Sequence, residues 1–278
     1  MLTIVPTPLG NLRDITLRAL DALASADVIA CEDTRRTRGL LSAHAIPAPE
    51  LVACDERRER QVADRLAARA LAGESVVLVS DAGMPLIADP GRLIVTRALA
   101  AGCEVVVLPG ASAVETALVA SGLASEGYAF AGWVPRAVGE RARFLGAAVA
   151  APLPTVAFES PRRLAVTLAD LARIAPAHPI ADARELTKLH EEVVRGSAAD
   201  VAAAAITERG EICLVIAAAA RVARGTAPSP EALAAVRELV AHGLPARTAS
   251  ELVARLTGAP RRALYDGAVK PVPPPTLP

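Results

Sequence analysis

The sequence predicts an α/β protein made of two α/β domains and a small helical module. Short apolar runs typical of β-strands alternate with longer helical patterns through residues 1–113, which favours βαβ units and a parallel sheet. The strand-like runs of residues 114–220 are joined by fewer helices, and alternating polar residues near Glu191 suit antiparallel pairing, so we expect a mixed sheet there. Three short helical patterns in residues 231–270 predict a module of helix-turn-helix size.

The elements of the first domain follow from apolar runs and from the residues that stop them. Gly73 and Gly102 stand where helices are expected to end, because glycine readily adopts the left-handed conformation of a helix C-terminus. The expected strands are residues 2–5, 27–31, 51–54, 76–80 and 105–108, and the expected helices are residues 15–24, 34–43, 56–72 and 87–101.

The later elements are expected on the same grounds. Residues 221–230, RVARGTAPSP, lack apolar periodicity and predict a linker, and the proline-rich residues 271–278 predict a disordered tail. The expected strands of the second domain are residues 128–132, 155–159, 180–187, 190–196 and 211–217, and the expected helices of the terminal module are residues 231–241, 246–256 and 260–269.

Composition and charge limit the classes of function. The chain has 278 residues, of which 53% are hydrophobic, and its 30 basic and 30 acidic side chains cancel. This length suits about two domains, and zero net charge gives no general attraction to nucleic acid or to a membrane surface. Any contact with RNA must therefore come from local patches.

The sequence shows no signal for a membrane, a metal or an oxidising compartment. No apolar run reaches the ~18 residues that span a bilayer and no secretory leader opens the chain, so we expect a cytoplasmic protein with no membrane partner. The four cysteines stand singly in apolar runs, with no histidine at ligand spacing, which favours reduced thiols and no metal site.

Four polar segments follow strands of the first domain, at the sheet edge where open α/β sheets bind ligands. They are PTPLGNL at residues 6–12, CEDTRRTR at 31–38, SDAGMPLIADPG at 80–91 and PGASA at 109–113. None is a GxGxxG or Walker loop, so a dinucleotide or nucleoside triphosphate has no support. The two glycines and two prolines of residues 80–91 indicate a preorganised loop that a ligand can approach closely, although a long ordinary turn is the alternative.

The segment at residues 31–38 places three arginines beside two acidic residues at the start of a helix. Asp33 or Thr34 can cap that helix. Capping leaves the arginines unexplained, because cations oppose the helix dipole at its N-terminus. An anionic partner or paired carboxylates would offset that cost, and a solvated charged face is the alternative.

Two further segments carry candidate chemistry. In PGASA and the residues after it, Ser112 and Glu115 match a capping box, which is a complete structural explanation for both. Lys188 is one of only two lysines among the 30 basic residues, and in a chain that otherwise uses arginine this suggests a specific need for an amine, with a lysine retained by chance as the alternative.

A family resemblance rests on six segments taken in order: TPLGNLRDITLRAL, CEDTRRTRGLL, SDAGMPLIADPG, PGASA, FESPRRL and ARELTKLHEE. Together they resemble the ribosomal RNA small-subunit methyltransferase I family, the bacterial 2′-O-methylating branch of the tetrapyrrole (corrin/porphyrin) methylase superfamily. The resemblance runs from about residue 2 to residue 217, and the terminal helices resemble the helix-turn-helix appendage of that family. Two positions depart from its usual pattern, since Arg162 replaces a common histidine and Ala157 a common aromatic residue.

The resemblance implies S-adenosylmethionine bound between two α/β domains, a homodimer, and methyl transfer to the ribose of a decoding-region cytidine in small-subunit (16S) rRNA. The cofactor is expected at Pro8, Gly10, Asp81, Ala82, Gly83, Met84, Pro85, Ile87, Ala88, Ser112, Phe158 and Leu186. RNA is expected at Arg35, Arg36, Arg38, Arg162 and Arg163, and the chemistry at Lys188, Asp33, Glu159 and Glu185.

The hypothesis for catalysis is that Lys188, near one of the other three catalytic candidates, orients or deprotonates the ribose hydroxyl. Neighbouring carboxylates would raise the pKa of its amine, in which case Lys188 only polarises the oxygen. Two alternative functions remain open. One is a methyltransferase of the same superfamily that acts on a tetrapyrrole and does not need the arginine-rich segments. The other is a noncatalytic RNA-binding adaptor, against which the intact loops argue.

Overall fold

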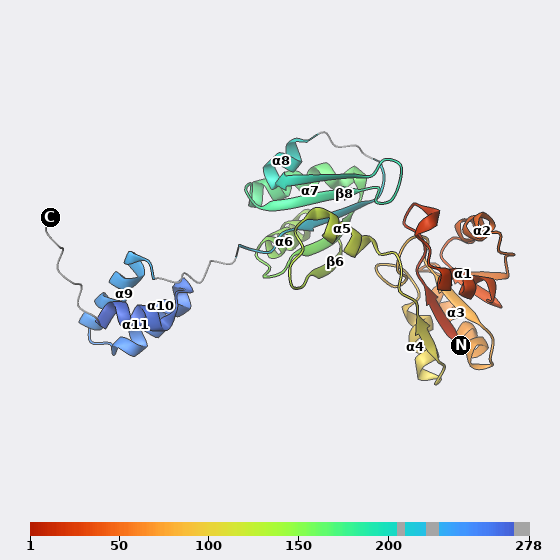
Figure 1. Ribbon diagram of the computed structural model, residues 1–278, viewed down its shortest axis with the longest axis horizontal. Helices are drawn as coiled ribbons and strands as arrows, with labels where there is room; N and C mark the ends of the chain where they lie inside the picture. Colours follow the sequence, from red (N-terminus) through yellow and green to blue (C-terminus); the bar gives the residue numbers. More distant parts are fainter. Residues whose placement is uncertain (205–208, 221–227, 270–278) are drawn as a thin grey trace. The chain divides into compact units, whose positions relative to one another are not determined.

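The computed structural model describes residues 1–204, 209–220 and 228–269. The chain forms two compact units, Met1–Ala218 and Ala219–Pro278, and each is considered by itself (Figure 1). The predicted tail, Lys270 and residues 221–227 of the predicted linker lie outside the described residues. The predicted domain boundary at residue 113 stays a prediction.

The first half of the larger unit, here the first lobe, contains a sheet of five parallel strands in the order β3-β2-β4-β1-β5. These strands are almost entirely apolar and the central ones are buried, as parallel strands covered on both faces must be. They are β1 (Leu2–Val5), β2 (Val28–Cys31), β3 (Glu50–Ala53), β4 (Val76–Val79) and β5 (Val105–Val107).

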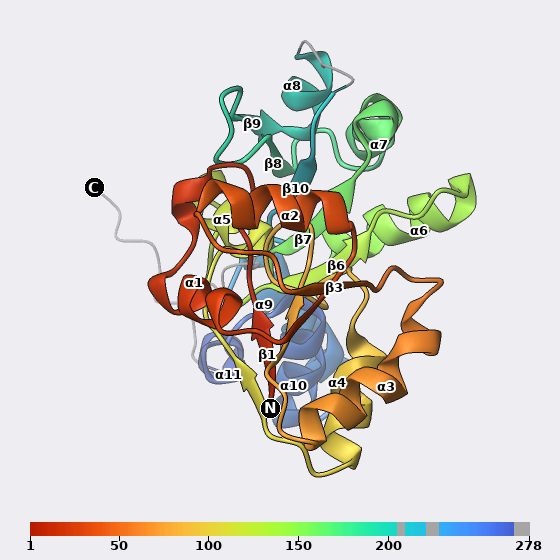
Figure 2. The same ribbon diagram turned by 90° about the vertical axis from the view of Figure 1, so that its right-hand side faces the viewer.

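Helices cover both faces of this sheet. Helices α1 (Leu17–Ala24) and α2 (Thr34–Ala43) pack on one face, where Leu23 and Leu41 are fully buried. Helices α3 (Glu59–Leu71) and α4 (Arg92–Ala100) pack together on the other face (Figure 2). A short 3₁₀ helix, Leu12–Asp14, precedes α1. The parallel arrangement brings the loops after β1, β2, β4 and β5 to the same sheet edge.

The second lobe is a mixed sheet in the order β6-β7-β10-β8-β9, in which only β6 and β7 pair in parallel. Helix α5 covers one face, and α6, α7 and α8 cover the other. The strands are β6 (Ala129–Trp133), β7 (Thr155–Glu159), β8 (Pro179–Arg184), β9 (Glu192–Ser197) and β10 (Ile212–Ile216). The helices are α5 (Ala113–Ser121), α6 (Val138–Val149), α7 (Pro161–Ile174) and α8 (Ala198–Ala203).

The smaller unit contains three helices, α9 (Pro230–Ala241), α10 (Ala246–Thr257) and α11 (Arg261–Val269). Val236, Val253 and Leu264 form the centre of its own small core. The α/β class, the parallel first sheet, the mixed second sheet and the helical terminal module are therefore confirmed.

Several predicted elements extend beyond the observed ones, and two of these differences lie beside the loops at a sheet edge. The helix predicted from residue 87 begins only at Arg92, because Gly91 has a φ of 123° and the carboxylate of Glu59 accepts the backbone N–H groups of Gly91 and Leu93. The strand predicted to residue 187 ends at Arg184, because the chain then turns with positive φ at Glu185 and Thr187. Both corrections lengthen loops at the edge of a sheet.

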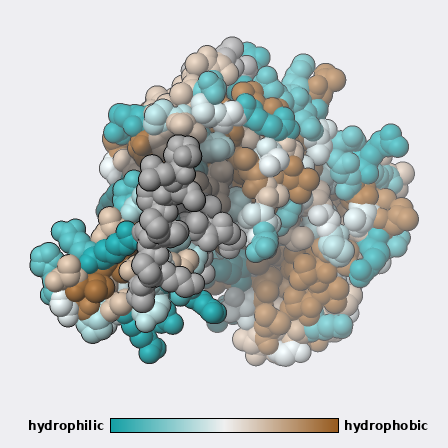
Figure 3. Space-filling view, turned by 60° about the vertical axis from the view of Figure 1, so that its left-hand side comes forward, coloured by the Kyte–Doolittle hydropathy of each residue, from teal (hydrophilic) through white to brown (hydrophobic). Residues whose placement is uncertain are grey.

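The surface of the described residues carries both polar and apolar groups. On the face that Figure 3 shows, hydrophilic side chains are distributed between smaller hydrophobic areas. Among the described residues, no helix combines the length and hydropathy that crossing a membrane requires.

Candidate functional site

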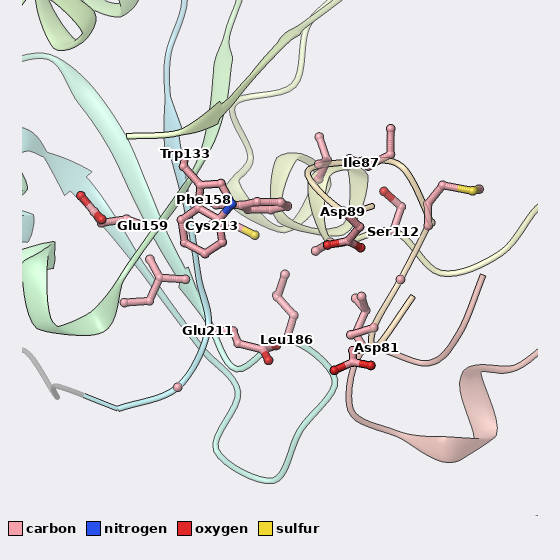
Figure 4. A pocket seen from close by; sticks show the side chains of 18 of the residues that line it. Asp81, Ile87, Asp89, Ser112, Trp133, Phe158, Glu159, Leu186, Glu211 and Cys213 are labelled. Atoms are coloured by element: carbon pink, nitrogen blue, oxygen red, sulfur yellow. The ribbon is translucent and has the colours of Figure 1, made fainter. Parts of the chain in front are cut away.

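Loops of both lobes enclose a cavity of about 450 Å³, which lies within the ~300–1,000 Å³ typical of small-molecule sites (Figure 4). One side is built by the first lobe, from the loops after β1, β2, β4 and β5. The other side is built by the ends of β6 and β7, the turn after β8 and the start of β10. The expected meeting of the first-sheet loops with the second lobe is thus present.

The loop after β4 supplies most of the first-lobe side. Gly83 exchanges backbone hydrogen bonds with Thr7 at 2.9 and 3.0 Å, and the hydroxyl of Ser80 donates to the Gly83 carbonyl at 3.0 Å. Leu86 and Ala88 have φ values of 70° and 68°, a conformation that costs side-chain-bearing residues energy and is concentrated at functional sites. The loop is therefore held in one shape, as its sequence predicts.

The cofactor residues expected from the resemblance fall into three groups. Seven of them line the main cavity: Asp81, Ala82, Gly83, Met84, Ile87, Ser112 and Leu186, and Phe158 joins them from β7. Pro8 and Gly10 line an adjacent hollow of about 330 Å³, which shares Asp81 and Arg36 with the main cavity. Pro85 and Ala88 belong to the β4 loop without lining either space.

Ser112 does not cap α5 with its side chain, although it occupies the N-cap position. Its hydroxyl instead donates to the carboxylate of Glu115, which also accepts from the hydroxyl of Tyr128. The predicted capping box is therefore wrong, because the side chains of Ser112 and Glu115 bond to each other, and Glu115 also to Tyr128, instead of to the backbone N–H groups of the helix end. Ser112 also lines the cavity.

Three carboxylates, Glu32, Asp81 and Asp89, line the first-lobe side and are here called the acidic wall. Asp81 accepts the backbone N–H of Asp33 at 3.0 Å, and its other oxygen lies 3.4 Å from Nε of Arg36. Burial and the charge of Asp81 raise the pKa of Glu32. Burial, together with the charges of Glu32 and Asp81, raises the pKa of Asp89 to about 7. The wall therefore carries more negative charge than one arginine neutralises.

The second-lobe side is apolar and aromatic. Phe158 forms edge-to-face contacts with Phe130 and Trp133, with ring centroids 5.0 and 5.5 Å apart, and these three residues are here called the aromatic wall. Cys213 lies beside them in the cavity lining, and burial raises the pKa of its thiol to about 12, so the sulfur stays protonated and uncharged. This wall suits the flat, weakly polar face of a ring.

Lys188 lies at the junction of the two lobes. Its Nζ is 2.8 Å from Oε1 of Glu185 and 3.1 Å from Oε2 of Glu211. Its side chain crosses Gly10 so closely that a Cβ at position 10 would overlap Cγ of the lysine. Burial alone would lower the pKa of Lys188, but the hydrogen bond to Glu185 and the charge of Glu211 raise it. The amine is therefore a cation at neutral pH.

The other predicted catalytic carboxylates are occupied elsewhere. Both oxygens of Asp33 hold Arg35, at 2.7 and 3.1 Å, and the hydrogen bond from Arg35 lowers the pKa of Asp33. Asp33 also caps α2 through the backbone N–H of Arg35. Neither Asp33 nor Glu159 contacts Lys188, so the expected pairing of Lys188 is confirmed only for Glu185.

Glu159 is one of the residues that line the cavity, but its carboxylate is buried against α7. Its carboxylate lies 2.5 Å from Nη2 of Arg163 and accepts the hydroxyl of Thr167 at 2.5 Å and the N–H of Ser160 at 2.6 Å. Figure 4 shows the carboxylate turned away from Phe158. These contacts favour a structural role, and its catalytic role stays a prediction.

The five arginines expected at RNA are not equivalent. Arg35 pairs with Asp33, Arg36 with Asp81, and Arg163 with Glu159. Arg38 and Arg162 are exposed and form no ion pair within the described parts of the chain. The positive charge available to an anionic partner is therefore concentrated on two arginines and on the exposed side of Arg36.

Four residues of the site escaped the sequence reasoning. Glu32 and Asp89 lie inside segments that were singled out, but only the fold brings them together. Glu211 immediately precedes β10 and reaches Lys188 from a distant part of the chain. Trp133 could have been noticed as the single tryptophan of an aromatic-poor chain. Within the described ranges, no group of three or more acidic, histidine or cysteine side chains could hold a metal ion.

Comparisons with known proteins agree with this architecture. The Tetrapyrrole (Corrin/Porphyrin) Methylases family matches residues 1–202, and the RsmI C-terminal HTH domain matches residues 226–270. A Neisseria meningitidis serogroup B protein named Ribosomal RNA small subunit methyltransferase I is 41% identical over 272 residues, covering 96% of this chain and 92% of that protein. The protein of the same name from Mycobacterium tuberculosis is 43% identical, covering 95% and 93%.

Two solved structures share the fold. The methyltransferase CobJ superimposes with a TM-score of 0.59 and 21% identity, covering 79% of this chain and 94% of that one. Uroporphyrin-III C-methyl transferase from Thermus thermophilus, complexed with S-adenyl homocysteine, gives a TM-score of 0.55 and 22% identity, covering 78% and 96%. The chain therefore belongs to the tetrapyrrole (corrin/porphyrin) methylase family and, within it, to the ribosomal RNA small subunit methyltransferase I proteins.

Proposed function

We propose that this protein transfers the methyl group of S-adenosylmethionine to small-subunit ribosomal RNA, and that the acceptor is the ribose 2′-hydroxyl of a decoding-region cytidine. The observation that carries the proposal is the cavity between the lobes, with an acidic wall facing an aromatic wall. It occurs in a chain that matches small-subunit rRNA methyltransferases along nearly its whole length. The cytidine and its 2′-oxygen come from the sequence resemblance.

S-adenosylmethionine is the cofactor of this family, since the Thermus thermophilus relative holds S-adenyl homocysteine, the compound that remains after the methyl group is given up. The cavity fits such a molecule. Its sulfonium and ammonium groups are cationic, and Asp81, Asp89 and Glu32 supply negative charge on one side. On the opposite side of the cavity, Phe158 and Leu186 can contact the apolar parts of the cofactor. When bound, the cofactor supplies an electrophilic methyl group.

The residues around the junction then have distinct tasks. The ribose oxygen must be held in line with the methyl group and close to it, which is the main contribution an enzyme makes to such a displacement. Lys188 is a cation, so it can donate a hydrogen bond that positions the ribose oxygen and lowers the pKa of its hydroxyl, but it cannot take the proton, which leaves to water as the oxygen gains the methyl group. Glu185 and Glu211 fix the position of its amine. Arg38 and Arg162 are free to meet phosphates.

The test is methyl transfer from S-adenosylmethionine carrying an isotope-labelled methyl group. The purified full chain is incubated with small ribosomal subunits from a strain that lacks the enzyme, and the digested rRNA is analysed by mass spectrometry. The proposal expects labelled 2′-O-methylcytidine at one decoding-region position. Label on a base would overturn the ribose assignment, and label on uroporphyrinogen or a precorrin with none on rRNA would overturn the RNA assignment. Naked rRNA in a parallel reaction shows whether the assembled subunit is required.

A further inference from the structure

Aromatic residues are rare in this chain, yet half of them form one cluster, and two members of that cluster, Trp133 and Phe158, line the cavity. The sequence contains one tryptophan, two tyrosines and three phenylalanines. Of these six, Phe130, Trp133 and Phe158 form the aromatic wall. Phe130 and Phe158 also pack against the core of the second lobe, whereas Trp133 belongs to none of its core clusters.

A β-bulge aims Trp133 at the cavity. Phe130 pairs with Val156 and Trp133 with Phe158, so three steps along β6 correspond to two along β7. Because strand side chains alternate between faces, a regular strand would place Phe130 and Trp133 on opposite faces. The extra residue puts both on the face of Phe158, and Gly132 provides the left-handed φ of 70° at the bulge.

The indole is left open to solvent although it is large and apolar. Trp133 is 56% exposed while it lines the cavity, whereas Phe158 is half-buried behind it. Figure 4 shows the indole beside the ring of Phe158. Trp133 therefore lies where a ring entering from outside meets the cavity, and Phe158 holds the indole in place from one edge.

Positive charge lies along the backbone next to Trp133. The guanidinium of Arg163 donates to the carbonyl of Val134 at 3.1 Å, and the N–H of Val134 donates to the carbonyl of Phe158 at 3.0 Å. Arg162, adjacent to Arg163, is exposed and has no ion pair in the described structure. Arg162 thus brings an unpaired cation to the start of α7, the helix whose Arg163 contacts the residue after Trp133. Proteins hold unpaired nucleotides with aromatic faces and cations of this kind.

We propose that Trp133 is the stacking platform for the base of the methylated nucleotide, with Arg162 meeting the phosphate beside it. This inference rests on the proposed function and deepens it. A nucleotide must leave its stack for its ribose to reach an enclosed cofactor, and stacking on an aromatic side chain offsets the energy lost when the base is turned out. Trp133 is thus a positioning residue for RNA and contributes nothing to binding of the methyl donor.

The test uses the full chain and the variants Trp133→Ala and Trp133→Phe, with Val166→Ala as the matched control. Val166 is an apolar side chain of the same lobe, 52% exposed on α7 and outside the cavity lining. We expect Trp133→Ala to raise the KM for small subunits roughly 10- to 100-fold, the range for loss of one base–aromatic stack. S-adenosylhomocysteine affinity, measured by calorimetry, should not change. Trp133→Phe should recover most of the loss, and Val166→Ala should behave as wild type.

Because the chain has one tryptophan, its emission reports on Trp133 alone. A decoding-region RNA oligonucleotide should quench it in the presence of S-adenosylhomocysteine, and S-adenosylhomocysteine alone should not. Quenching by S-adenosylhomocysteine with no further change on adding RNA would overturn the inference in favour of a platform for adenine. An unchanged KM in a Trp133→Ala enzyme that still methylates RNA would also overturn it. Failure of the wild-type chain to methylate RNA would instead refute the proposed function.

Discussion

The two walls of the cavity differ in chemistry and in how the chain builds them. The acidic wall consists of loops at the end of a parallel sheet, where Glu32, Asp81 and Asp89 come from two neighbouring strands. The aromatic wall consists of the strands themselves, and a single bulge in β6 decides which side chain reaches the cavity. In the proposed function the charged side meets the cationic groups of the methyl donor and Phe158 meets its apolar parts, while the exposed Trp133 is left for the base.

The largest effect is expected at Lys188, between the two lobes. In Lys188→Arg the charge is kept, but a planar guanidinium cannot replace a compact amine placed between Glu185 and Glu211 and against Gly10. We expect kcat to fall by roughly 10²-fold or more, with S-adenosylhomocysteine affinity unchanged in calorimetry. Near-normal turnover would show that the amine has no specific part in the reaction.

A substitution at Glu159, next to Phe158, distinguishes a structural role of this residue from a catalytic one. Glu159→Gln breaks the buried pair with Arg163 and should lower the free energy of unfolding by about 3 kcal/mol. Denaturant unfolding measures it, and the exposed Glu192→Gln of the same lobe is the control. Turnover per folded molecule should be preserved. A large loss of kcat with unchanged stability would instead give Glu159 the catalytic role that the sequence resemblance implies.

The acidic wall makes a pH-dependent prediction. Because the pKa of Asp89 is about 7, its carboxyl is largely neutral below that pH and negatively charged above it. Affinity for S-adenosylmethionine should therefore rise as pH increases through 7, by roughly tenfold for one added charge at short range. Asp89→Asn should abolish this rise in calorimetric titrations from pH 6 to 8, while Asp21→Asn, on the exposed side of α1, should retain it. A rise that persists in Asp89→Asn would contradict the assignment.

The smallest effect is expected from the arginines outside the walls. Replacing Arg38 and Arg162 with alanine should weaken RNA binding a few-fold and lower the salt dependence of binding by about one to two phosphate contacts. Arg36 is a different case, because it pairs with Asp81 and its loss should also alter cofactor affinity. Filter binding at several salt concentrations tests both statements. An unchanged salt dependence in the double variant would remove these arginines from the RNA interface.

Local sequence signals predicted the strands and most of the helices because buried parallel strands are short, apolar and bounded by glycine and proline. Errors occurred where a distant residue decides the structure. Glu59 holds the backbone ahead of α4, so the helix begins five residues later than its apolar pattern indicates. The carboxylate of Glu115, which the local pattern assigned to a capping box, bonds instead to the side chains of Ser112 and Tyr128.

The same division between local and distant signals holds for the site. The loop segments that line the cavity were predicted from their glycines, prolines and charged residues and from the family resemblance. Which side chains meet within the site could not be predicted from local sequence. Glu211, for example, reaches Lys188 only because β8 and β10 pair antiparallel. The direction in which Trp133 points depends on one extra residue in β6. The sequence signal for this bulge is Gly132, a glycine inside a strand.

A crystal structure of the full chain grown with S-adenosylhomocysteine would show whether the cavity between the two walls holds the methyl donor. We expect the ligand between the lobes, with its ammonium group toward Asp81 and Asp89 and the indole of Trp133 uncovered. Ligand bound elsewhere, or with its adenine stacked on Trp133, would contradict this expectation.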